Sequence, residues 1–182
     1  ALVGVSVAAV VVGAGVLVEL GVRQLFAPTG CTAEVDGHEV ELSLEQAENA
    51  ALITALSVRR GMPARAATIA LATAYQESKL VNIDYGDRDS VGLFQQRPSQ
   101  GWGTVEQIMD PVYATHAFYD GLEKVADYRG LEVTEAAQAV QRSAHPDAYA
   151  DHERDARTLA SALTGNHRAA FWCTVDGEVE EG

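Results

Sequence analysis

The first 18 residues carry no charged side chain and consist of Val, Ala, Leu and Gly with a single Ser6. An apolar run of this length is enough for a helix to cross the ~30 Å hydrocarbon core of a bilayer. Glu19 ends the run, and Arg23 follows one turn later. We therefore expect residues 1–22 to form a single transmembrane anchor in the cell membrane, with the rest of the chain folded on its extracytoplasmic side.

A cleavable signal peptide is the alternative interpretation of this run. Such a peptide has an apolar region of only ~7–15 residues and then a small-residue cleavage site. No A-x-A-like site lies between Val18 and Cys31. A lipidated Cys31 is a weaker alternative, because Pro28 stands where a lipobox has Leu and because 12 residues separate Cys31 from the apolar run. The anchor remains the preferred interpretation.

The charge and length of the chain limit its possible partners and its fold class. The 182 residues include 13 Lys and Arg against 26 Asp and Glu, which gives a net charge of -13. Such a chain lacks the basic footprint that binds phosphate backbones, so nucleic acid is not an expected partner. Hydrophobic residues make up 47% and charged residues 21%, a globular composition. The length suffices for one domain with a sizeable core.

Two cysteines lie near the two ends of the exported part. Residues 31–37 (CTAEVDG) and 173–177 (CTVDG) are similar, and each segment predicts a short strand that ends in an Asp-Gly turn. Cysteines at the ends of an exported domain favour a disulfide. We therefore predict a Cys31–Cys173 bond beside a two-stranded β appendage. Two free thiols in a cytosolic protein are the alternative, which the membrane segment disfavours.

Helix signals fill most of the chain between the cysteines. Capping boxes begin at Ser43 and Thr104, and Asp110 precedes a proline at the first position of a helix. These signals divide the chain into an anchor, a linker with a short strand, a helical domain, and a C-terminal strand with an acidic tail, over residues 1–22, 23–42, 43–165 and 166–182. Within the domain we expect helices over 44–60, 64–77, 111–125, 134–140 and 146–165. Residues 78–103 have no helical period, and a loop of that length is usually functional.

Glu77 is the candidate catalytic residue. It ends an Ala-rich helix that is expected to be buried nearly all round. Burial and the negative end of the helix dipole both disfavour the carboxylate there, so we expect a raised pKa. A carboxyl group that stays protonated near neutral pH is what general-acid cleavage of a glycosidic bond requires. The alternative is an ordinary exposed Glu at the end of a helix.

A second motif follows Glu77-Ser78 at a characteristic distance. Gly92-Leu93-Phe94-Gln95 lies 15 to 18 residues after Glu77, and Leu80 falls between the two motifs. This pattern resembles the soluble lytic transglycosylase and goose-type lysozyme branch of the lysozyme-like superfamily. Asp110-Pro111 resembles the Asp-Pro helix of that family, and residues 75–78 and 92–103 most closely resemble a set of actinobacterial secreted lysozyme-like proteins.

The resemblance implies an all-α lysozyme-like fold and a glycosidase that cleaves the MurNAc–GlcNAc β-1,4 bond of peptidoglycan. Glu77 would be its general acid and base, whether it acts as a lytic transglycosylase or as a muramidase. Tyr149 resembles the later cleft tyrosine of the family. Gln141 and Arg142 stand where the family has Tyr-Asn, which is a departure at the position that holds the acetamido group of the sugar.

An acidic loop separates the two motifs, where the family has Ser and Gly-Ala. Hydrolytic glycosidases, of which lysozyme is the standard example, pair their catalytic acid with a second carboxylate. Asp84, Asp87 and Asp89 are the candidates for that partner, with an ordinary solvated loop as the alternative. A calcium site is disfavoured, because the run lacks the alternating ligands and the glycine of an EF-hand.

The remaining candidates bind substrate. Trp102 lies between two glycines and either stacks on a sugar ring or serves as a buried lid. The full expected set is Ser78, Gln95, Gln96, Trp102, Gln141 and Tyr149. The five histidines show no metal-ligand spacing, so neither a metal nor another cofactor is expected. The expected partners are peptidoglycan strands and the membrane. A catalytically silent module that binds glycan or a cell-envelope protein is the alternative function.

Overall fold

The computed structural model describes residues 29–143 and 147–175, and Gly30–Cys173 form one compact unit. The expected anchor at residues 1–22, the first residue of the expected last helix, Pro146, and the acidic tail lie outside the described residues. Among the residues described, none of the helices is long and apolar enough to cross a membrane.

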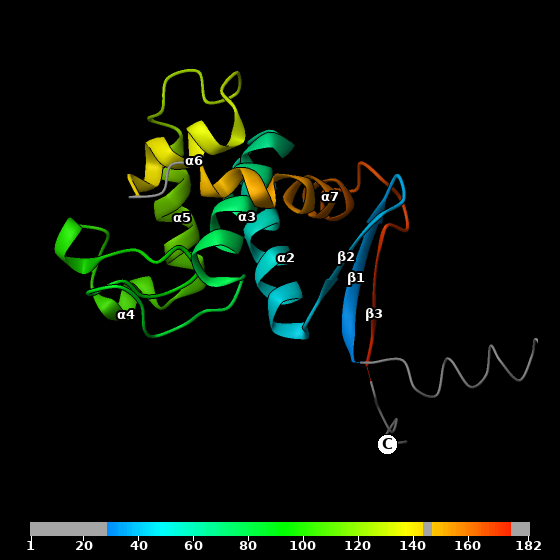
Figure 1. Cartoon of the computed structure of the whole chain (residues 1–182), viewed down its shortest axis with the longest axis horizontal. Helices are drawn as coiled ribbons and strands as arrows, with labels where there is room; N and C mark the ends of the chain where they lie inside the picture. Colours follow the sequence, from blue (N-terminus) through cyan, green and yellow to red (C-terminus); the bar gives the residue numbers. More distant parts are fainter. Residues whose placement is uncertain (1–28, 144–146, 176–182) are drawn as a thin grey trace, which may run out of the picture. The chain divides into compact units, whose positions relative to one another are not determined.

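A small antiparallel sheet brings the two ends of this unit together (Figure 1). Its order is β2-β1-β3, with β1 at Gly30–Val35, β2 at His38–Leu42 and β3 at Phe171–Thr174. The Cys31–Cys173 disulfide joins β1 to β3, which confirms the predicted bond. The predicted ribbon of two strands was incomplete, because β2 adds a third.

The turn between β1 and β2 explains the extra strand. Asp36 and Gly37 have φ angles of 51° and 73°, and two consecutive positive φ values are typical of the two-residue turns that close β-hairpins. The hairpin register therefore pairs Val35 with His38. Val40 and Leu42 of β2 face the core while Glu39 and Glu41 are exposed, as expected for a strand with one buried face.

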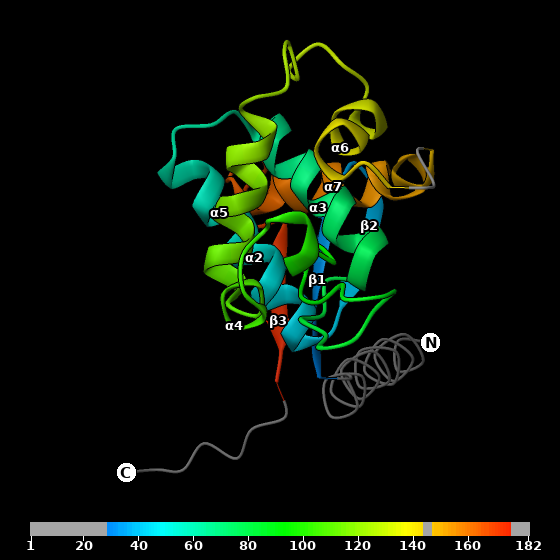
Figure 2. The same ribbon diagram turned by 90° about the vertical axis from the view of Figure 1, so that its left-hand side faces the viewer.

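The Ala-rich helix α3, Ala64–Ser78, lies at the centre of the helices (Figures 1 and 2). It contacts α2 (Leu44–Arg59), α5 (Pro111–Leu122), α6 (Val133–Gln141) and α7 (Glu153–Leu163). Every residue of α3 from Ala66 to Ala74 is buried, as the composition predicts. Small side chains let four helices pack closely around one axis, and the sheet packs on the outer side of α7 and α2.

The shorter elements shape the surface around the end of α3. They are the 3₁₀ helices η1 (Pro98–Gln100) and η2 (Ala148–His152) and the one-turn helix α4 (Val105–Ile108). Two expected helices differ from the structure. The one from Pro111 ends at Leu122 rather than Val125, and the last one is divided into η2 and α7.

Candidate active site

Glu77 lies in the last turn of α3 with its side chain half-buried. Burial raises its pKa, while two hydrogen bonds oppose that shift. The Tyr149 hydroxyl donates to Oε1 at 2.7 Å, and the Gln141 side-chain amide reaches the same oxygen at 3.3 Å. The result is a carboxyl group that is held by two neutral donors and has a raised pKa. A raised pKa is what general-acid chemistry requires of a glutamate.

Both donors arrive from elements that pack on α3. Gln141 is the last residue of α6, and Tyr149 belongs to η2. Tyr149 is fully buried, and burial together with the nearby carboxylate raises the pKa of its hydroxyl well above the usual range. Tyr149 therefore keeps its proton and acts as a donor to Glu77 at any pH at which the domain is expected to work.

The residues of the second motif hold the end of α3 in place. Ser78 is buried and its hydroxyl donates to the carbonyl of Leu93 at 2.8 Å. The carbonyl of Phe94 accepts the Gln141 amide at 2.7 Å, so that one side chain links Glu77 to this loop. Gly92 has a φ of 80°, and a Cβ there would lie 2.7 Å from the carbonyl oxygen of Ile108. The loop therefore requires glycine at this position.

The two glutamines after Phe94 have different surroundings. Gln96 is buried, pairs with Val91 through its backbone, and donates its side-chain amide to the carbonyl of Ala114 at 3.1 Å. The structure therefore places Gln96 in the core. Gln95 is half-buried and donates to the carbonyl of Tyr85 at 3.2 Å, which braces the acidic loop.

Within the described residues, no carboxylate of the acidic loop is a hydrogen-bond partner of Glu77. Asp89 accepts from Arg97 Nε at 2.7 Å and from the backbone N–H of Ser99 at 2.8 Å, which holds its pKa well below the usual range. Asp84 and Asp87 are exposed. Among the described residues, Glu77 accepts hydrogen bonds from the side chains of Tyr149 and Gln141. Asp89 thus has a structural role in the loop.

A cleft of about 780 Å³ adjoins this group. Trp102 and Tyr113 form part of its wall, and Gln141 lines it while contacting Glu77. The Tyr113 hydroxyl donates to the carbonyl of Trp102 at 3.1 Å, which fixes the loop that carries the tryptophan. Trp102 is half-buried, so the structure places an aromatic ring with an accessible edge in the wall of the cleft.

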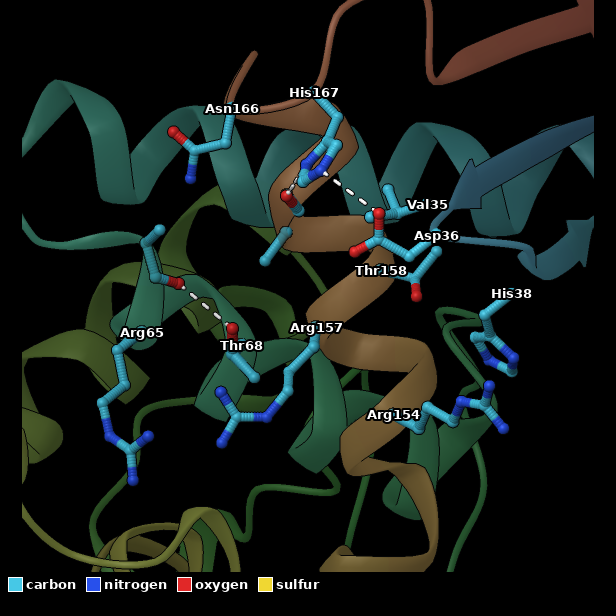
Figure 3. A pocket seen from close by; sticks show the side chains of 13 residues that line it. Val35, Asp36, His38, Arg65, Thr68, Arg154, Arg157, Thr158, Asn166 and His167 are labelled. Atoms are coloured by element: carbon cyan, nitrogen blue, oxygen red, sulfur yellow. Dashed lines mark hydrogen bonds and ion pairs between the residues drawn. The ribbon is translucent and has the colours of Figure 1, made fainter.

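A second cavity, of about 440 Å³, lies at the opposite end of α3 (Figure 3). Its basic side chains are largely engaged. Arg157 pairs with Glu153 and His38 with Asp155 at 2.7 Å, and Arg65 donates to the carbonyl of Leu131. This cavity is lined from the first turns of α3 and contains neither Glu77 nor its two donors. Gln141, a donor to Glu77, lines the larger cleft, so we place the candidate active site there.

A contact that the sequence does not predict holds η2, the element that carries Tyr149, against α3. The imidazole of His152, at the end of η2, stacks on Tyr75 with ring centroids 4.9 Å apart. Its Nε2 lies 2.9 Å from Oε1 of Gln76. His152 thereby holds η2 against the last turn of α3. Tyr149 and Glu77 are separated by 72 positions in the sequence, so no local spacing predicts their contact.

Within residues 29–143 and 147–175, no group of three His, Cys, Asp or Glu side chains is arranged to hold a metal ion. Comparison with protein-family models gives no match for the chain, and comparison with curated proteins gives none either.

Proposed function

We propose that this chain is a lysozyme-like glycosidase that cleaves the MurNAc–GlcNAc β-1,4 bond of peptidoglycan. One observation carries the proposal: a half-buried glutamate with a raised pKa lies in the last turn of the central helix and accepts from two neutral donors, one of which, Gln141, lines a cleft. The spacing of Glu77 from Gly92-Leu93-Phe94-Gln95 supports the same conclusion. The disulfide supports a domain that folds outside the cytoplasm.

The proposed mechanism uses one carboxyl group twice. Protonated Glu77 gives its proton to the glycosidic oxygen as the C1–O bond breaks, which leaves positive charge at C1 of the MurNAc ring. Tyr149 and Gln141 then stabilise the new carboxylate by donating to it. That carboxylate removes the proton from the 6-hydroxyl of the same ring, and O6 bonds to C1. The product is a 1,6-anhydro sugar, and no second carboxylate or water is consumed.

The surroundings of Glu77 favour this lytic transglycosylase route over hydrolysis. Hydrolytic glycosidases generally place a second carboxylate about 5–9.5 Å from the acid. Asp89 is engaged by Arg97 and Ser99 instead. Because the transglycosylase route needs no second carboxylate, we expect substitutions at Asp84 and Asp87 to leave cleavage unchanged.

A catalytically silent module that binds glycan or an envelope protein is the second candidate. The observation that favours it is the position of Gln141, whose amide is engaged by Glu77 and Phe94. An amide held in this way is less available to the acetamido group of a sugar.

The test is Glu77→Gln in the whole chain, incubated with purified peptidoglycan. The amide is isosteric but has no proton to give, so cleavage should fall by about 10²- to 10⁴-fold while glycan binding persists. Mass spectrometry identifies the product, because an anhydro end is lighter than a reducing end by one water. Glu48→Gln, at an exposed position of α2, should cleave normally. If the wild-type chain leaves glycan uncut under all conditions, the silent module replaces the enzyme.

A further inference from the structure

The cleft beside Glu77 differs in charge from the rest of the molecule. The chain has twice as many acidic as basic residues, 26 against 13. Two cationic side chains nevertheless line this cleft, Lys124 and Arg142. They come from different elements, since Lys124 follows the end of α5 and Arg142 caps the end of α6. An excess of positive charge in one concave site of an acidic protein indicates an anionic ligand.

The acidic group in the same wall already has a cationic partner. Asp120 is the carboxylate among the lining residues, and Arg60 binds it at 2.7 Å. The same guanidinium binds Glu123 at 2.7 Å. Lys124 and Arg142, by contrast, are exposed and have no ion pair within 4.0 Å among the described residues. Their charges are therefore available to a ligand.

The backbone holds Arg142 at a defined place beside the candidate acid. Its N–H donates to the carbonyl of Gln138 at 2.8 Å, and its φ is 54°. This left-handed conformation is common at the C-terminal end of a helix, and here it ends α6 at Arg142. Gln141, the preceding residue, contacts Glu77. Arg142 and Gln141 thus line the same cleft, and Gln141 connects that cleft to the candidate acid.

We infer that this cleft selects a glycan that carries carboxylate groups, and that Lys124 and Arg142 are the residues that select it. Naming the glycan rests on the proposed function. In peptidoglycan the carboxylate is that of the MurNAc lactyl group, either free or at the far end of an attached peptide stem. The guanidinium of Arg142 can receive a carboxylate with two parallel hydrogen bonds, and Lys124 adds a point charge.

Binding separates this inference from catalysis. The whole chain with Glu77→Gln is titrated calorimetrically with three probes: stem-free glycan strands with lactyl carboxylates, the same strands with peptide stems, and neutral GlcNAc oligomers. The test variant adds Lys124→Gln and Arg142→Gln. The matched control adds Arg88→Gln and Arg168→Gln, which remove two charges from exposed positions elsewhere.

We call Lys124→Gln with Arg142→Gln the cleft pair and Arg88→Gln with Arg168→Gln the control pair. We expect the cleft pair to lower the affinity for the carboxylate-bearing glycans at least tenfold and the control pair to lower it less than twofold. Affinity for the neutral oligomers should be unchanged by both. Added salt should weaken only the binding that the cleft pair supports. A larger loss with stem-free strands assigns the selectivity to the lactyl carboxylate, and a larger loss with stem-bearing strands assigns it to the peptide.

Two results would overturn the inference: an equal loss for charged and neutral glycans, or equal losses with the two double variants. Neither depends on cleavage. If the wild-type chain cuts no glycan but the cleft pair still governs binding of the charged probe, the proposed enzyme fails while the selectivity stands. If the wild type cuts and the cleft pair changes nothing, only the selectivity fails.

Discussion

At Glu77, burial and hydrogen bonding act on the same proton in opposite directions. Burial raises the pKa of the carboxyl group, and the donors Tyr149 and Gln141 lower it by stabilising the carboxylate. The raised pKa shows that burial prevails. An acid that must give up a proton and later take one benefits from this balance, because neither protonation state is strongly preferred.

Removing the Tyr149 hydroxyl should change that balance in a direction that can be measured. Tyr149→Phe deletes the donor at 2.7 Å, so the pKa of Glu77 should rise further. The alkaline limb of the kcat/KM profile should move to higher pH, and kcat/KM should fall by about 10- to 100-fold for the loss of one bond to a charged group. Tyr128→Phe, whose hydroxyl is not a partner of Glu77, should change neither. A limb that moves to lower pH would contradict this account.

The same carboxyl group should make stability depend on pH. A pKa that is raised on folding means that the native state holds its proton over a range in which the unfolded chain has lost it. Stability from this group is therefore complete below the unfolded pKa and is lost as the pH rises through the folded pKa. The melting temperature of Glu77→Gln relative to wild type should rise between pH 4 and 8. For Glu48→Gln the difference should stay flat.

The sequence identifies some residues of the site and not others, for physical reasons. Glu77 is identifiable because helix periodicity predicts its burial, and its distance from Gly92 is fixed by one loop. The sequence predicts that Gln96 either binds glycan or satisfies loop backbone, and the bridge to Val91 that buries it depends on tertiary structure. The ion pair of Asp89 with Arg97, and the lack of one for Arg142 among the described residues, depend on tertiary structure that no spacing encodes.

At the scale of elements, capping signals locate the starts of helices well. The predicted boxes at Ser43 and Thr104 are confirmed, with the partner glutamines three residues on. The sequence does not predict β2, because its five residues of alternating character are short and because the Asp-Gly turn before them also fits the end of a strand. The division of the last helix into η2 and α7 was also missed, since the contact of His152 with α3 is tertiary.

Asp110 offers a test of how much such a cap contributes. Its Oδ1 accepts from the N–H of Val112 at 2.9 Å, ahead of a proline at the first position of α5. Asp110→Ala should lower the free energy of unfolding by about 1 kcal/mol. Urea denaturation checks the value, with Asp84→Ala as the exposed comparison. Equal midpoints for the two variants would show that the cap contributes nothing.

For the molecule as a whole, the disulfide is the largest single constraint. It spans 142 residues, and the chain-entropy model assigns about 5 kcal/mol to closing a loop of that size. Cys31→Ser with Cys173→Ser should therefore unfold at a markedly lower urea concentration. The comparison is the wild-type chain under reducing conditions, which should match the double variant. An unchanged midpoint would mean that the helices alone determine stability.

The same bond determines how the domain would respond to a pull on its two ends. Cys31 and Cys173 lie in the first and last strands of the folded unit. Tension applied beyond them passes from one strand to the other through the sulfur atoms, and the helices between them bear none of it. A domain stretched between two attachment points would thus keep its length and its cleft until the bond was reduced.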